Sequence, residues 1–270
     1  MTLIPVEAPE DFSLAQQFIE PYEETCVSLA SLVRRKSDKL IFITNSESPV
    51  GILNLDSTIY HCIPNPDLLD VDFLKTNLPY FLKKPVKCIS GEKKATDFLQ
   101  KIFLDPAQIY DYKMMRWGGP STGSTTLSGG EEIIRCTEHD MEILHPLQKD
   151  YMKDEVAVPG RPITDAEVDM ALRNILKNQL CFALTVDGDI VAKANTNAIG
   201  INKVQIGGVY THPLYRRNGY AAALVTALSN RAIRSGKEPV LFVKEKNMPA
   251  FTLYRKIGFE ECGQYAIAYY

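Results

Sequence analysis

The sequence lacks several features that would direct it to particular classes of protein. Six cysteines are spread over the chain without a Cys-x-x-Cys pair, and four histidines show no ligand spacing, so no metal site is predicted. The cysteines are expected to be buried free thiols. No apolar run reaches the length needed to cross a bilayer, and the acidic N-terminal stretch does not resemble a signal peptide. A cytoplasmic protein with no membrane partner is therefore expected.

The chain also lacks an excess of positive charge. Its formal net charge is −3 over 270 residues, which gives no basic field for DNA or RNA, so a nucleic-acid partner is not expected. The hydrophobic share of 45% and the charged share of 23% are typical of a folded globular protein. At this length the chain can bury a sizeable core in one large domain or two ordinary domains. The oligomeric state cannot be read from the sequence.

Residues 118–130, GGPSTGSTTLSGG, form the clearest boundary in the sequence. Glycine, serine, threonine and proline at this density bury too little apolar surface to stay ordered alone. We interpret the segment as a linker or long loop. It divides the chain into an N-terminal α+β domain, 1–117, and a second domain, 131–270.

Hydrophobic periodicity and turn residues predict a similar order of elements on both sides of this boundary. In the first half we expect helical structure over 11–35, strands at 39–44, 49–55 and 58–63, a helix over 68–82, a strand at 86–90, a helix over 92–104 and a strand at 109–117. In the second half we expect a strand at 132–136, helices over 141–152 and 165–177, strands at 180–186, 189–195 and 204–211, a helix from 221, a strand at 240–244, a helix over 247–257 and a terminal strand. Asp187-Gly188 indicates a hairpin turn.

The segment 204–236 is the most informative in the chain. An extended stretch with two internal glycines ends at His212-Pro213, and after an arginine-rich turn the apolar spacing changes to that of a helix. The first backbone N–H groups of a helix lack intrahelical partners, and the helix dipole attracts negative charge to that end. Gly219 allows close approach of a ligand, and Arg216 and Arg217 add charged donors. The turn is therefore predicted to hold a pyrophosphate, although a solvated surface turn is the alternative.

Arg216, Gly219 and Ala221 follow the pattern Gln/Arg-x-x-Gly-x-Gly/Ala, and here the chain resembles the GNAT (GCN5-related N-acetyltransferase) superfamily. The resemblance covers roughly the second half. It implies an α+β GNAT fold, with a mixed, mostly antiparallel sheet flanked by helices, and acetyl-CoA or coenzyme A as co-substrate. It continues downstream in Asn247, Pro249, Ala250, Leu253, Tyr254, Gly258 and Phe259.

The first half has a similar element order but no coenzyme loop. Residues 64–67 after its third predicted strand, PNPD, contain neither arginine nor glycine. We interpret this half as a degenerate GNAT-like lobe that acts as a packing partner or substrate wall. An unrelated α+β domain is the alternative.

The resemblance also assigns cofactor residues. It implies that the backbone at Val209, Tyr210 and Thr211 binds the pantetheine arm, while Gly207 and Gly208 suit a bulge there. The Val209 N–H would face the thioester oxygen, although these positions also fit an ordinary strand end. Asn247 would cap its helix and contact the pantetheine. The pyrophosphate would bind Arg216, Arg217, Asn218, Gly219, Tyr220 and Ala221.

Tyr254 and Glu155 are the catalytic candidates. By resemblance Tyr254 protonates the coenzyme thiolate, although periodicity alone also fits a core tyrosine. The general base that takes the proton from the amine is assigned to Glu155, with His212 as second candidate, and either residue also fits an ordinary surface or turn position. Lys193 and Asn195 share one strand face, which would line the acceptor channel or face solvent.

Together these features predict an acetyl-CoA-dependent N-acetyltransferase in which a primary amine attacks the thioester directly. No grouping of cysteine, serine and histidine resembles an activated nucleophile, so no covalent intermediate is expected. The acceptor, a small-molecule amine or a peptide amine, is not readable. A non-catalytic acyl-CoA sensor and a transferase of a longer acyl group remain as alternatives.

Overall fold

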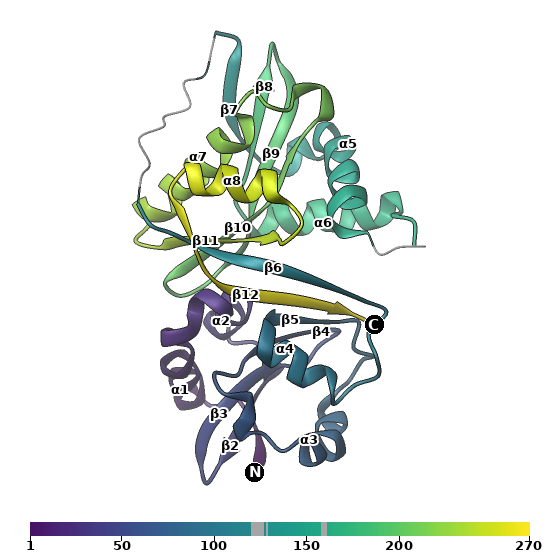
Figure 1. Cartoon of the computed structure of the whole chain (residues 1–270), viewed down its shortest axis with the longest axis vertical. Coiled ribbons are helices and arrows are strands. Elements are labelled where there is room, and N and C mark those ends of the chain that lie inside the picture. Colours follow the sequence, from purple (N-terminus) through teal and green to yellow (C-terminus); the bar gives the residue numbers. More distant parts are fainter. Residues whose placement is uncertain (120–126, 128, 158–160) are drawn as a thin grey trace.

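The computed structural model describes residues 1–119, 127, 129–157 and 161–270. Two lobes are stacked along the long axis of the molecule, and the long strands β6 and β12 cross between them (Figure 1). Within the described residues, no helix combines the length and apolar character needed to span a membrane.

The lower lobe in Figure 1 is built mainly from the first half of the chain. Its elements in order are β1 (Thr2–Pro5), α1 (Pro9–Ile19), the 3₁₀ helix η1 (Glu20–Thr25), α2 (Val27–Arg34), β2 (Leu40–Asn45), β3 (Ser48–Asn54), β4 (Thr58–Cys62), η2 (Pro66–Leu68), α3 (Val71–Asn77), η3 (Leu78–Phe81), β5 (Cys88–Glu92), α4 (Lys93–Gln100) and β6 (Gln108–Trp117). Short β1 pairs with β2 and was missed from the sequence, because four residues ending in proline carry little strand signal.

The upper lobe repeats this order. Its elements are β7 (Glu131–Cys136), η4 (Glu138–Asp140), α5 (Met141–Tyr151), the π-helical turn η5 (Met152–Val156), α6 (Asp165–Asn178), β8 (Cys181–Val186), β9 (Asp189–Ile199), β10 (Lys203–Thr211), η6 (Pro213–Tyr215), α7 (Tyr220–Arg234), β11 (Glu238–Lys244), α8 (Met248–Lys256) and β12 (Phe259–Tyr269). The predicted hairpin between β8 and β9 is present, with positive φ at Asp187 (50°) and Gly188 (94°).

In the described residues the strands join one 12-stranded sheet in the order β1-β2-β3-β4-β5-β12-β6-β11-β10-β9-β8-β7. Most neighbours are antiparallel, and the parallel pairs are β4 with β5 and β10 with β11. The last strand of each half is exchanged: β12 pairs with β5 of the first half, and β6 pairs with β11 of the second. Each half therefore has the same strand arrangement, which agrees with a GNAT-like first lobe.

Helices cover both faces of the upper lobe. Leu224 and Leu228 of α7 pack with Ile206 and Leu241 of the sheet, and α8 joins the same core. On the other face α5 and α6 pack through Leu144, Val168 and Leu172 against Cys181 and Ala183. The site described below lies where β10 and β11 run between these layers.

Two further expectations concern the cysteines and the boundary. All six cysteines are free, as predicted; five are buried and Cys262 is half-buried. Residues 120–126 and 128 of the predicted linker lie outside the described residues. The division into domains 1–117 and 131–270 stays a prediction.

Candidate active site

Strands β10 and β11 separate in the middle of the upper lobe. Their parallel pairing runs from Lys203 to Ile206 on β10, opposite Glu238–Leu241, and then stops. On its other side β10 skips register with β9 between Gly207 and Tyr210. Gly208 and Val209 therefore have no register partner on either neighbouring strand. The bulge that the two glycines suit is present, and β10 and β11 splay apart beyond Ile206.

Glycine is required at the bulge for two reasons. Gly208 has φ of +58°, a left-handed backbone that side chains disfavour. A Cβ at Gly208 would overlap Asn195 Oδ1, and a Cβ at Gly207 would overlap the amide of Asn197. The side chains of β9 thus occupy the space that the two glycines leave.

The loop after β10 leads directly into the start of α7. Arg216 donates from Nε to the carbonyl oxygen of Thr211 at 3.1 Å, and its guanidinium lies 5.5 Å from the centre of the Tyr210 ring. Arg217 has a φ of 69°, and Gly219 occupies the N-cap position with φ of 82°. The N-cap makes no side-chain hydrogen bond, and the first turn of α7 carries no acidic residue. The first N–H groups of this helix are thus available to an anion.

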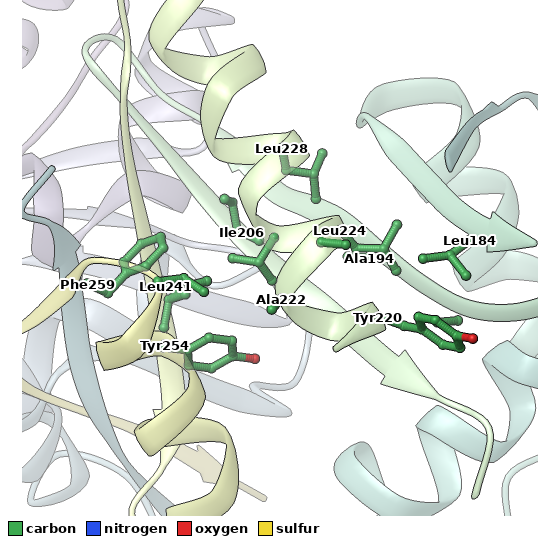
Figure 2. Close-up of a cluster of buried hydrophobic side chains, with 14 of the residues drawn as sticks. Leu184, Ala194, Ile206, Tyr220, Ala222, Leu224, Leu228, Leu241, Tyr254 and Phe259 are labelled. Carbon is green, nitrogen blue, oxygen red and sulfur yellow. The ribbon is translucent and has the colours of Figure 1, made fainter. Parts of the chain in front are cut away.

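Tyr254 lies on the α7 and α8 face of the sheet. Asn247 caps α8 as expected, because its Oδ1 accepts the backbone N–H of Ala250 at 3.2 Å. Figure 2 shows the Tyr254 ring beside Phe259, with the hydroxyl directed away from Phe259. Burial raises the pKa of Tyr254 well above its usual value of 10, so the hydroxyl keeps its proton at neutral pH.

Glu155 approaches from the opposite side of the sheet. It lies in η5, which follows α5, and its carboxylate pairs with Lys244 at 3.3 Å at the end of β11. The Glu155 side chain is 32% exposed. Burial is the main cause that raises the pKa values of Tyr151 and Tyr254, and the negative charge of Glu155 adds to it. The roles of Tyr254 as acid and Glu155 as base stay predictions.

His212, the second candidate for the base, takes part in the loop. Its Nδ1 accepts the N–H of Leu214 at 3.4 Å, and its ring packs edge-on against Tyr215. These contacts are those of a turn residue.

The sequence left two alternatives for the strand face of Lys193 and Asn195, namely the acceptor channel or solvent. The structure rules out solvent. Both side chains are buried, at 0% and 1% exposure. Lys193 Nζ donates to the Gly208 carbonyl oxygen at 2.9 Å and to Asn195 Oδ1 at 3.3 Å. The two residues therefore lie beneath the bulge of β10.

Two residues near the bulge were not identified from the sequence. Asp154 accepts a hydrogen bond from the Tyr210 hydroxyl at 2.8 Å and lies 3.6 Å from the Arg216 guanidinium. Tyr151 presents its ring to Lys193 and contacts the backbone of Gly208. Both are on or just after α5, far from β10 in sequence, and neither belongs to a recognisable motif.

Sequence comparison finds a family model that matches part of the second half. Residues 188–267 match the model of the FR47-like protein family. This range contains the bulge, the arginine-rich loop, α7 and Tyr254. No curated protein matches the chain.

Solved structures resemble the whole chain. A Drosophila protein shares 12% identity with a TM-score of 0.65, covering 99% of this chain and 98% of its own. A tandem GNAT protein from the clavulanic acid biosynthesis pathway shares 11% identity with a TM-score of 0.61, covering 99% and 98%. A GNAT-family acetyltransferase from Colwellia psychrerythraea shares 12% identity with a TM-score of 0.58, covering 100% and 99%. The resemblance to the GNAT superfamily is thus confirmed in the fold, which is a tandem GNAT fold.

Proposed function

We propose that this chain, with its tandem GNAT fold, is an acetyl-CoA-dependent N-acetyltransferase whose site lies in the second half. One observation carries the proposal. The splayed strand β10 leads through Arg216 and Gly219 into an uncapped helix, α7, so exposed strand backbone is followed by free helix N–H groups. This sequence of features suits a ligand with an extended amide arm and a pyrophosphate.

The cofactor contacts follow from these positions. The backbone of Val209, Tyr210 and Thr211 binds the pantetheine arm of acetyl-CoA, and Asn247 contacts the same arm from α8. The pyrophosphate accepts hydrogen bonds from the turn that comprises Arg216, Arg217, Asn218, Gly219, Tyr220 and Ala221. Burial of the thioester beside Tyr254 keeps water from the reacting carbonyl.

The reaction is direct transfer. The nitrogen of a primary amine attacks the thioester carbonyl carbon, and the carbonyl oxygen gains negative charge that the Val209 N–H stabilises. When the C–S bond breaks, its electron pair stays on sulfur, and Tyr254 gives that thiolate a proton. Glu155 accepts the proton that the amine nitrogen loses. The products are the acetylamide and coenzyme A.

The first lobe lacks a corresponding coenzyme loop. After β4 the chain continues through Pro64 and Asn65 into η2, a helix of three residues that is too short to present a helix N-terminus. We assign the first lobe to packing and to one wall of the acceptor site, and the acceptor itself is a small-molecule amine or a peptide amine.

Calorimetric titration with acetyl-CoA and with coenzyme A tests the proposal. Wild type is expected to bind both at micromolar Kd, and Gly219→Arg is expected to abolish binding by filling the turn. Gly236→Arg is the matched control, because Gly236 follows the other end of α7, has a φ of 73° and would place a Cβ in open space. Absence of binding by wild type would refute the proposal.

Turnover is tested by thiol release over a library of primary amines, with acetyl-, propionyl- and succinyl-CoA as donors. Release with acetyl-CoA and at least one amine supports the transferase. Coenzyme binding without release from any donor would instead favour a non-catalytic acyl-CoA sensor, and a preference for a longer donor would indicate a deeper acyl pocket.

A further inference from the structure

Lys193 is a fully buried lysine, with 0% exposure, in the centre of β9. Within the described parts of the chain, no carboxylate forms an ion pair with it. A buried ammonium without a counter-ion costs several kcal/mol unless its N–H groups are satisfied. Its partners are instead the Gly208 carbonyl oxygen at 2.9 Å, Asn195 Oδ1 at 3.3 Å and the Tyr151 ring, whose centre is 4.7 Å away. All three partners lie around the bulge of β10.

The bond to Gly208 fixes the orientation of one particular peptide group. The Gly208 carbonyl and the Val209 N–H belong to the same planar unit, and the described chain contains no cis peptide. In a trans peptide the C=O and N–H bonds point in opposite directions. The Val209 N–H therefore points away from Lys193, and Val209 has no register partner on β9 or β11.

We propose that Lys193 is a positioning residue for acyl transfer: its ammonium holds and polarises the Gly208–Val209 peptide, so that the Val209 N–H is a fixed, strengthened donor to the thioester oxygen. A cation on the carbonyl oxygen draws electron density from the peptide and makes its N–H a better hydrogen-bond donor. The inference rests on the proposed function, because the thioester belongs to acetyl-CoA. Lys193 acts through the peptide and does not contact the substrate.

Neighbouring side chains keep the ammonium in this position. Asn195, which accepts from Lys193, also donates from Nδ2 to Asn197 Oδ1 at 3.1 Å and to the Thr196 carbonyl oxygen at 3.0 Å. Asn195 also fills the space next to Gly208, since a Cβ there would overlap its Oδ1. The bulge, the asparagine and the lysine thus form one connected arrangement.

The charge on Lys193 is sensitive to pH. Burial lowers its pKa to about 8, and the facing titratable groups are Cys136 of β7, Cys181 of β8 and Tyr151 of α5. The charge of Asp140 in η4 opposes ionisation of Cys181, and the charge of Glu155 in η5 opposes ionisation of Tyr151. Below about pH 8 the Lys193 ammonium is charged and polarises the Val209 N–H. Above about pH 8 the lysine is neutral, and this polarisation is lost.

The test uses acetyl-CoA labelled with ¹³C at the thioester carbonyl, bound to the full chain and observed by infrared difference spectroscopy. In wild type at pH 7 the carbonyl stretch is expected to shift to lower frequency on binding. Lys193→Met, which keeps the length without the charge, is expected to lose at least half of that shift and to release thiol ~10- to 100-fold more slowly. Its Kd for coenzyme A is expected to stay unchanged.

The control is Lys203→Met. Lys203 is the first residue of β10, away from the bulge, and its ammonium pairs with Glu238 on the surface. This variant is expected to keep the full carbonyl shift. A second measurement needs no variant: in wild type the frequency shift of the bound thioester carbonyl should become smaller as pH rises through about 8. This measurement also applies if Lys193→Met does not fold.

The outcomes separate the two proposals. If wild type does not bind acetyl-CoA, the proposed function fails. If wild type binds and releases thiol, but its carbonyl shift is the same in Lys193→Met or does not change between pH 7 and 9, the role of Lys193 is refuted and the transferase remains.

Discussion

Both carboxylate oxygens of Glu23 accept the backbone N–H of Asn202, at 2.9 Å each, across 179 residues of sequence. Glu23 Oε1 also accepts from Ile201 at 2.6 Å and from Lys203 at 3.0 Å. The carboxylate is 1% exposed. A side chain of η1 in the first half thus supplies the acceptor for three N–H groups in the turn between β9 and β10, the two strands that carry Lys193 and the bulge.

Glu23→Gln is expected to destabilise the protein by about 2–4 kcal/mol, because an amide leaves part of the N–H cluster without an acceptor and loses the charge that strengthens each bond. Urea unfolding at pH 7 measures the change. Glu20→Gln, on the exposed side of the same short helix, is the matched control and should differ from wild type by less than about 0.5 kcal/mol. Equal midpoints for the two variants would show that this contact does not hold the halves together.

A buried histidine gives the first lobe a pH-dependent stability. His61 on β4 is 1% exposed, its Nε2 lies 2.9 Å from Thr96 Oγ1, and its Nδ1 has no partner among the described residues. Burial lowers its pKa from 6.5 to about 3. The unfolded chain therefore binds a proton below pH 6.5 that the folded chain excludes, and stability is lost as pH falls from 6.5 toward 3.

Between pH 7.5 and pH 5.0 this one group should remove about 2 kcal/mol of stability. His61→Gln should flatten that part of the pH dependence, while His139→Gln, exposed on η4, should not. Urea unfolding at the two pH values measures the slopes. Other titrating groups contribute alike to all three proteins, so parallel slopes in wild type and His61→Gln would contradict the prediction.

The turn before α7 and the bulge of β10 were predictable because their determinants are contiguous in sequence. Gly208 with φ of 58° and Gly219 with φ of 82° are positions where a side chain is disfavoured, and the change from strand to helix spacing between them is a local signal. The helix that carries Tyr254 and its cap at Asn247 also form one local pattern. Each of these features lies within one short segment, so the pattern needs no information about distant neighbours.

Strand exchange and the burial of Lys193 depend on contacts between distant segments. Alternation of Tyr110, Tyr112 and Met114 predicts a strand but does not specify its neighbours, and β6 pairs with β12 and β11, more than 120 residues further on. Lys193 and Asn195 alternate as an exposed strand face would, yet α5 covers that face with Tyr151. The partners of β6 and the burial of Lys193 by α5 are therefore seen only in the tertiary structure.

Tyr254→Phe is expected to lower thiol release about 10²- to 10⁴-fold while the Kd for coenzyme A stays the same, because the ring still packs but no proton reaches the thiolate. Tyr265→Phe is the control: this buried hydroxyl bonds Ser90 Oγ at 2.8 Å on the exchanged strand, so its removal should lower stability and leave release intact. Steady-state rates and calorimetry measure both variants. Full activity in Tyr254→Phe would mean that another group protonates the sulfur.

Glu155→Gln is expected to lower the amine-dependent kcat about 10²- to 10⁴-fold at pH 7, since the amide cannot accept a proton from the acceptor. The acceptor amine loses its proton to solvent near pH 10, so the deficit should shrink as pH rises. Glu138→Gln, exposed at the start of η4, is the matched control with the same loss of charge.

A pH series of kcat for the best amine in the thiol-release screen decides between the two candidates for the base. A deficit that narrows as pH rises identifies Glu155, whose carboxylate pairs with Lys244, as the base. An unchanged rate in Glu155→Gln together with a pH-dependent deficit in His212→Gln would move the role to the loop histidine. Because His212 already uses Nδ1 to accept the N–H of Leu214, its turn position is the weaker geometry for that task.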